Sequence, residues 1–176
     1  MLYVFDLDST LVTRYRVDVL PGVSAKLDEL AGQGHALAVA TNQAGPAWRT
    51  ATGRSKYPDP ARLGARLARI ADSLAPLAPV PWFVAIGDGR LELSDGDYRD
   101  IEIALCRGAG SLDLRPSADL VWRKPGPGML LAACAHYGLP TEAATYVGDM
   151  ETDAAAAAGA GAAFVYANVF FGSAGG

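Results

Sequence analysis

Short apolar runs alternate with amphipathic segments along most of the chain. Five runs have the length and composition of buried strands, and they are Leu2–Phe5, Ala36–Ala40, Trp82–Ile86, Thr145–Val147 and Ala162–Tyr166. Ile101–Leu105 is a further strand candidate. Because the predicted strands alternate with predicted helices, we expect a parallel sheet with helices on both faces.

Four segments between these runs have helical patterns. Arg62–Leu74 is the clearest, because apolar residues recur on one face at helical spacing. Three further helices are predicted. One follows Pro21-Gly22, one begins at Gly126-Pro127-Gly128 and runs to about Tyr137, and one covers Asp153–Ala158. Ser24 is a candidate cap for the first helix. The Gly- and Pro-containing stretch Gly45–Pro60 is interpreted as an exposed loop.

This pattern predicts an α/β fold, a three-layer Rossmann-like sandwich with a central parallel sheet. The 176 residues suit one domain, so we expect residues 1–176 to form a single unit with no large cap domain. Ligands of such sheets bind beyond the carboxyl ends of the strands. Candidate chemistry is therefore sought at those ends.

Composition and charge narrow the function classes. The net charge is −4, without the basic excess of a typical nucleic-acid-binding protein. A local basic segment, Arg49–Arg69, could still follow a phosphate backbone, although a solvated helix face explains it as well. The two cysteines, Cys106 and Cys134, form no CxxC pair, so we expect neither a disulfide framework nor a thiolate zinc site.

The sequence also carries a prediction about location. The N-terminal apolar run is cut short by aspartates, unlike a signal peptide, and the Ala- and Gly-rich stretch Ala154–Ala167 is too short to cross a bilayer. We therefore expect a cytoplasmic protein without a membrane partner.

Polar clusters follow three of the predicted strands. Asp6 and Asp8 come after the first, and residues two apart in an extended segment point the same way. Such a pair can attack an electrophile, move a proton and attract a divalent cation. Thr41 and Asn42 end the second strand, where a hydroxyl and backbone N–H groups can hold phosphate oxygens. Each cluster alone could equally be a turn or a helix cap.

Two further clusters complete the set. Lys124, in Arg123-Lys124-Pro125, could neutralise a phosphate, or it could be a solvated surface lysine. Asp149 follows a strand and Asp153 comes four residues later, so both could ligand a metal or simply favour a helix N-terminus. The ordered series DxDST, TNQ, RKPGPGM and GDxxxD is far more specific than any of its members.

With these motifs the sequence resembles the haloacid dehalogenase (HAD) superfamily, and TNQ with RKPGPGM is similar to its capless subfamily III. That group includes histidinol-phosphate, heptose-bisphosphate and polynucleotide 3′-phosphatases. The resemblance implies a Mg²⁺-dependent phosphatase in which Asp6 attacks phosphorus and forms an aspartyl-phosphate. Asp8 would be the general acid and base.

The resemblance also implies the remaining site roles. Mg²⁺ would be held by Asp6, the backbone carbonyl of Asp8 and Asp149, with Asp153 in support. Thr41, Asn42 and Lys124 would hold the phosphoryl group, and Arg123 would touch the substrate.

The sequence departs from the family pattern at two places. Ser9 stands where many members have glycine. The Cys/His zinc loop that many heptose and histidinol phosphatases carry before the RKP motif has no counterpart, so zinc is not expected. The acidic segment Asp88–Asp100 has no assigned role.

Three functions remain open from the sequence. A phosphatase of small phosphorylated metabolites fits the acidic balance and the complete motif set. A polynucleotide 3′-phosphatase is the alternative that the basic segment Arg49–Arg69 supports. A non-catalytic phosphate-binding regulatory module is the third. An open, capless site is also compatible with enclosure by a second subunit.

Overall fold

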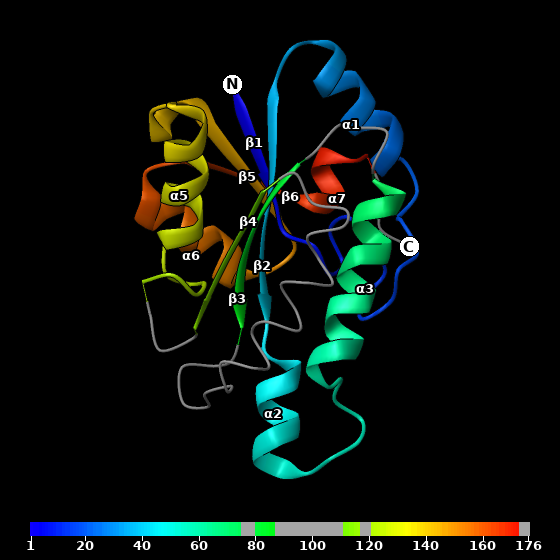
Figure 1. Cartoon of the computed structure of the whole chain (residues 1–176). Helices are drawn as coiled ribbons and strands as arrows, with labels where there is room; N and C mark the ends of the chain where they lie inside the picture. Colours follow the sequence, from blue (N-terminus) through cyan, green and yellow to red (C-terminus); the bar gives the residue numbers. More distant parts are fainter. Residues whose placement is uncertain (75–79, 87–110, 117–120, 173–176) are drawn as a thin grey trace.

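The computed structural model describes residues 1–74, 80–86, 111–116 and 121–172. Within these ranges six strands form one parallel sheet in the order β4-β3-β2-β1-β5-β6. They are β1 (Leu2–Phe5), β2 (Ala36–Gln43), β3 (Pro81–Ile86), β4 (Ser111–Pro116), β5 (Ala144–Gly148) and β6 (Ala163–Tyr166). The sheet is the middle layer of the molecule (Figure 1).

Helices cover both faces of the sheet. In Figure 1, α5 and α6 lie on one side, and α1, α3 and α7 on the other. Their bounds are α1 (Val23–Gly32), α3 (Pro60–Ser73), α5 (Gly128–Tyr137), α6 (Glu151–Ala160) and α7 (Ala167–Phe170). The predicted three-layer α/β fold with a parallel sheet is confirmed.

Strand order creates the site for a ligand. The chain runs outward from β1 through β2 and β3 to β4, and then returns to add β5 and β6 on the other side of β1. The direction of winding therefore changes between β1 and β5, which are paired from Leu2 with Ala144 to Phe5 with Val147. A crevice forms outside the carboxyl ends of strands at such a switch point.

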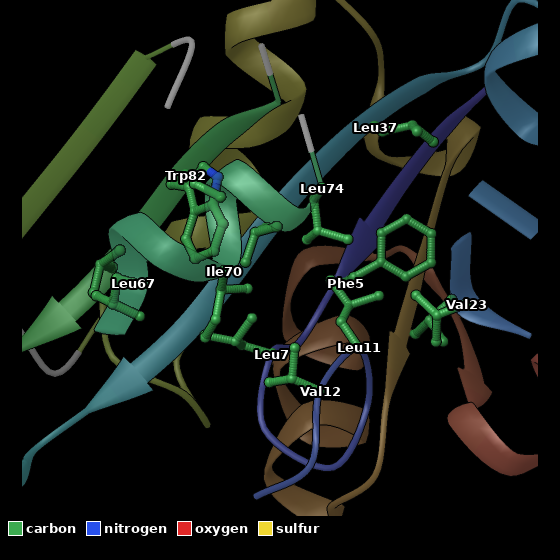
Figure 2. Close-up of a cluster of buried hydrophobic side chains, with 14 of the residues drawn as sticks. Phe5, Leu7, Leu11, Val12, Val23, Leu37, Leu67, Ile70, Leu74 and Trp82 are labelled. Atoms are coloured by element: carbon green, nitrogen blue, oxygen red, sulfur yellow. The ribbon is translucent and has the colours of Figure 1, made fainter. Parts of the chain in front are cut away.

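Alternation along each strand supplies two separate cores. On β1, Phe5 faces the side of α1 and α3, whereas Leu2 and Val4 face α5 and α6. Figure 2 shows the first core, in which Phe5 lies among residues of the loop after β1 and of α3, such as Leu11 and Ile70. Both faces of the central strands are buried, as expected for a parallel sheet. The two cores hold the strand ends in fixed positions.

The chain between β1 and α1 is anchored to the first core. Leu7, Leu11 and Val12 are buried there, and Val12 bridges to Asp8 and to Val19, which folds residues 8–19 into a small hairpin. Ser9 lies in the left-handed region at φ 62°. This backbone conformation explains why glycine suits the position, because serine has a Cβ that is strained there.

Two predictions at helices were wrong. The stretch Gly45–Pro60 is not wholly a loop, because Gly45–Thr52 forms the helix α2 beyond the end of β2 (Figure 1). Pro46 suits the first turn of that helix, and Ala47 is buried, so packing outweighs the turn-forming composition. Ser24 does not cap α1, because the N-cap is Gly22 in the left-handed conformation.

Several boundaries also differ from the expectations. α6 begins at Glu151 and continues through Gly159 to Ala160. β4 and α7 were not predicted. The predicted strand Ile101–Leu105 and the acidic segment Asp88–Asp100 lie outside the described residues.

No helix in the described ranges combines the length and the hydropathy that a membrane span requires. The predicted cytoplasmic location stays a prediction.

Gly128 offers a test of how the Lys124 loop is attached to α5. A Cβ at this position would lie 2.7 Å from Cα of Trp122 and from the carbonyl oxygen of Val121. Both are backbone atoms that cannot rotate away. We expect Gly128→Ala to lower the free energy of unfolding by about 1–3 kcal/mol, measured by urea denaturation.

Gly32→Ala is the matched control, because nothing lies within 4 Å of its added Cβ at the end of α1. It should be neutral or stabilising, since alanine favours a helix by up to about 1 kcal/mol over glycine. Equal effects of the two substitutions would contradict the proposed close approach at Gly128.

Candidate active site

Lys124 lies at the centre of the crevice beyond β1 and β5, and it is 4% exposed. Its Nζ donates to Oδ1 of Asp6 at 2.6 Å and to the hydroxyl of Tyr146 at 2.7 Å, and it lies 2.7 Å from Oδ1 of Asp153. One ammonium thus binds two carboxylates from different ends of the chain. The interpretation of Lys124 as a solvated surface residue is excluded.

The backbone around Lys124 is held by the second motif. Nδ2 of Asn42 donates to the carbonyl oxygen of Lys124 at 3.0 Å, and the Lys124 N–H donates to Oδ1 of Asn42 at 3.2 Å. Trp122, two residues before Lys124, is buried and donates from Nε1 to the carbonyl oxygen of Val84 at 3.1 Å. The lysine therefore projects from a loop that β2 and β3 fix in place.

Three carboxylates lie close enough to share a cation. One oxygen atom from each of Asp6, Asp149 and Asp153 lies within 4.8 Å of the other two. Carboxylate oxygens are the donors that Mg²⁺ prefers, and clustered acids are relieved of mutual repulsion by a cation. The donor set therefore fits the expected metal.

Gly148 allows this cluster to form. A Cβ there would lie 2.5–2.6 Å from the side chain of Asp153. Asp153 is also held by the N–H of Met150, which donates to its Oδ2 at 3.0 Å. The Gly-Asp pair of the fourth motif thus has a steric reason as well as a chemical one.

Burial and charge shift the pKa values at the centre of the site. Burial raises the pKa of Asp6 to about 6, with Lys124 opposing the shift and Asp153 adding to it. Desolvation and Asp153 also raise the pKa of Asp149. Burial alone would lower the pKa of Lys124, but Asp6 and Asp153 raise it, so the lysine is a permanent cation at neutral pH.

Asp8 occupies a different environment from Asp6. Its carboxylate accepts a hydrogen bond from Nε2 of Gln43 at 2.9 Å and one from the N–H of Tyr15 at 2.8 Å. Arg66 of α3 contacts both of its oxygens and donates from Nε to the carbonyl oxygen of Arg16 at 2.9 Å. The two aspartates therefore have different hydrogen-bond and ion-pair partners, and of the two only Asp6 belongs to the three-carboxylate cluster.

A cleft of about 1250 Å³ opens above these residues. Asp8, Asn42, Arg123 and Lys124 all line it. Thr41 is buried beneath, where its hydroxyl accepts a hydrogen bond from Nε2 of Gln43 at 3.0 Å. The structure therefore gathers all eight candidate residues at one edge of the sheet, while their individual chemical roles stay predictions.

Three residues of the site were not identified from the sequence. Tyr146 donates toward the carbonyl oxygen of Ala40 at 3.0 Å while accepting from Lys124, and it is an interior residue of a strand that looks purely structural. Gln43 joins Thr41 to Asp8, although its motif was recognised. Arg66 belongs to the basic segment but was not linked to Asp8. The only sequence signals were the polar tyrosine in an apolar strand and the helical spacing of the arginines.

An acidic cluster and a buried lysine thus lie together beyond the switch point of a parallel sheet. Residues 121–167, from the Lys124 loop through β6, match the family model described as HAD-hydrolase-like. No curated protein gives a significant sequence match.

Solved structures share the fold of this chain. D,D-heptose 1.7-bisphosphate phosphatase from B. bronchiseptica, complexed with magnesium and phosphate, has a TM-score of 0.62 and 22% identity, with 93% of this chain and 78% of that chain covered. A protein from Mesorhizobium loti described as a HAD-like phosphatase has a TM-score of 0.54 and 21% identity, covering 91% and 68%. The resemblance to the HAD superfamily is thereby confirmed in two respects: the chain shares the fold of these structures, and residues 121–167 match the HAD-hydrolase-like model.

The raised pKa of Asp6 makes cation binding sensitive to pH. Its folded pKa of about 6 lies above the usual 3.8, so protons compete for this carboxylate as the pH falls through 6. We expect Mg²⁺ to bind at least about fourfold more weakly at about pH 5.5 than at about pH 7.5 from this group alone. The raised pKa of Asp149 adds in the same direction.

Isothermal titration calorimetry at the two pH values, in buffers of different ionisation enthalpy, measures both the affinity and the protons released. In Asp6→Asn the dependence on pH should be smaller, because one competing carboxylate is gone. An unchanged affinity between the two pH values in the wild-type protein would contradict the expectation.

Proposed function

We propose that the protein is a Mg²⁺-dependent phosphomonoester hydrolase that acts on a small phosphorylated metabolite through an aspartyl-phosphate on Asp6. The observation that carries the proposal is the buried Lys124, which lines an open cleft and binds Oδ1 of Asp6 at 2.6 Å beside a three-carboxylate cluster. The HAD-hydrolase-like match over residues 121–167 supports the same reaction class.

Asp6 suits the role of nucleophile. With a pKa of about 6 it is mainly ionised at neutral pH, yet it is desolvated, so little water must be removed before it attacks. Lys124 orients the carboxylate and offers positive charge to the incoming phosphoryl group. Attack on phosphorus forms the Asp6–phosphate bond and breaks the bond to the leaving oxygen.

Asp8 suits the role of general acid and base. It lines the cleft above Asp6, where Gln43 and Arg66 orient its carboxyl group. It gives a proton to the leaving alcohol in the first half of the reaction. In the second half it takes a proton from the water that attacks phosphorus, which releases phosphate and restores Asp6.

Asp6, Asp149 and Asp153, with the backbone carbonyl of Asp8, would hold Mg²⁺. When bound, the cation neutralises the charge of the phosphoryl oxygens beside the carboxylates. Thr41, Asn42 and Arg123 are proposed to contact the phosphoryl group or the rest of the substrate. In the structure the amide of Asn42 is hydrogen-bonded to the backbone of Lys124, so its contribution includes the placement of that lysine.

We also propose that residues 1–176 form one capless domain of the subfamily III type. In the described part of the chain, the insertion after β1 is the small hairpin of residues 8–19, and the insertion after β2 is the single helix α2. Neither has the size of a separate domain. The cleft above Asp8 is accordingly open to substrates of different sizes.

The nucleophile is tested with an aryl phosphate and Mg²⁺. We expect Asp6→Asn to lower kcat by about 1000-fold or more, since an amide oxygen does not form the phosphoenzyme. Asp28→Asn, an exposed aspartate on α1, is the matched control and should retain wild-type kcat.

Thermal melting of both variants separates a chemical defect from unfolding. Equal rates in wild type and Asp6→Asn would contradict the proposal that the protein is an enzyme. The alternative of a non-catalytic phosphate-binding module would then remain.

The role of Asp8 predicts a dependence on the leaving group. An alkoxide needs a proton to leave, whereas a nitrophenolate does not. We therefore expect Asp8→Asn to lower kcat/KM for an alkyl phosphate at least about tenfold more than for a nitrophenyl phosphate. Steady-state kinetics with both compounds measures the ratio, and the same loss for both would assign Asp8 to positioning alone.

A further inference from the structure

Among the described residues that line the cleft, cations outnumber carboxylates, although the chain has an acidic balance. Eight of these residues are arginines or lysines and two are aspartates, Asp8 and Asp18, whereas the whole chain has a net charge of −4. Lys124 and Arg66 are paired with carboxylates of the site, Lys124 with Asp6 and Asp153 and Arg66 with Asp8. The excess of positive charge therefore comes from the other lining cations.

Three of the cationic side chains come from one face of α3. Arg62, Arg66 and Arg69 follow at four- and three-residue spacing, so they form a row along the helix. All three line the cleft. Neighbouring like charges on a helix are unfavourable unless something of opposite charge meets them.

Only the middle member of this row is neutralised within the described residues. Arg66 is paired with Asp8. Arg62 and Arg69 make no ion pair with any residue in the ranges that the structure describes. Two guanidinium groups with bidentate binding capacity thus face the same cleft without a counter-charge from that part of the chain.

The position of the row relates it to the reaction. Arg66 touches Asp8, which under the proposed function protonates the leaving group. Along the helix axis, the backbone of Arg62 lies about 6 Å to one side of Arg66, and that of Arg69 lies about 4.5 Å to the other side. Under that function, a group bound by Arg62 and Arg69 would lie on the side of the leaving group, because Arg66 between them contacts Asp8.

Aromatic side chains that line the cleft near the start of α3 suit the carbon skeleton of such a substrate. Trp48 of α2 is 40% exposed, and its ring lies 6.3 Å from that of Tyr57, with both residues lining the cleft. Lys56 lies over the ring of Tyr57 at 5.0 Å and adds a further cation beside it. Flat apolar surface beside positive charge binds a sugar or a ring that carries an anion.

From this juxtaposition we propose that Arg62 and Arg69 form a subsite for a second phosphate group on the leaving-group part of the substrate. The inference rests on the proposed phosphatase function and specifies its substrate class, a phosphomonoester that carries another phosphate ester on the same molecule. That second phosphate is either a further monoester of a small metabolite or the nearest phosphodiester of a 3′-phosphorylated nucleic acid.

Matched substrate pairs test the subsite. A hexose 6-phosphate is compared with the hexose 1,6-bisphosphate, and a nucleoside 3′-phosphate with the nucleoside 3′,5′-bisphosphate. We expect the second phosphate to raise kcat/KM by about tenfold or more in at least one pair, beyond the twofold that two cleavable groups would supply.

Variants connect that preference to the row on α3. In Arg62→Ala/Arg69→Ala the preference for the bisphosphate should fall about tenfold, while Arg62→Lys/Arg69→Lys should retain part of it because the charge remains. Lys26→Ala is the control, because this lysine on α1 pairs with Glu29 and does not line the cleft. Thermal melting verifies that each variant is folded.

A further arm distinguishes the two carriers of the second phosphate. A 3′-phosphorylated oligonucleotide that exceeds the nucleoside 3′,5′-bisphosphate in kcat/KM, with a steep dependence on salt, identifies a nucleic-acid end. A small bisphosphate that exceeds the oligonucleotide identifies a metabolite. Either result supports the subsite.

Two outcomes would overturn the subsite. One is a wild-type protein that hydrolyses both members of every pair equally, and the other is a preference that survives in the Arg62→Ala/Arg69→Ala variant. If the wild-type protein hydrolyses none of the compounds, the proposed phosphatase function fails instead. Calorimetric binding of the same bisphosphates to wild type and to the double variant then decides the subsite separately, since equal affinities would overturn it.

Discussion

The buried ammonium of Lys124 is the interaction on which the rest of the site depends. Taking a lysine and two carboxylates out of water costs several kcal/mol for each ion unless they are paired with good geometry. Here Nζ lies 2.6 Å from Asp6 and 2.7 Å from Asp153, and Tyr146 accepts a third hydrogen bond. Removing any one of these partners leaves buried charge uncompensated, so the fold and the site are energetically coupled.

That coupling explains why so much of the fold serves one side chain. The switch in strand order brings Asp6 beside the end of β5, and the glycine that ends β5 admits Asp153. β2 contributes Asn42, which grips the backbone of Lys124 from the other side. Two hydrophobic cores, one on each face of the sheet, then keep these strand ends in register. The acidic cluster is thereby preorganised rather than assembled when a ligand arrives.

A second layer of charge surrounds this centre and has a different purpose. Asp6 is paired with the buried Lys124, whereas Asp8 is paired with Arg66, which lines the open cleft. The same face of α3 then continues outward with Arg62 and Arg69. The acidic cluster is thus concentrated at the sheet edge, and residues of α2 and α3 line the cleft beside it.

The sequence by itself determined the architecture and eight of the residues that meet at the site, but not Gln43, Arg66 or Tyr146. Short continuous apolar runs and a helical face on Arg62–Leu74 are local patterns, and polar clusters after strands meet at one edge in any parallel sheet. The sequence did not predict the helix α2, because its start with Gly45 and Pro46 resembles a loop. It also did not predict the edge strand β4. Only the tertiary structure decided that Asp6 and Asp8 have different partners, that Tyr146 supports the lysine and that arginines of α3 face the cleft. Those contacts join residues up to 118 positions apart, and the energy of a pair depends on the burial that the whole fold creates around it.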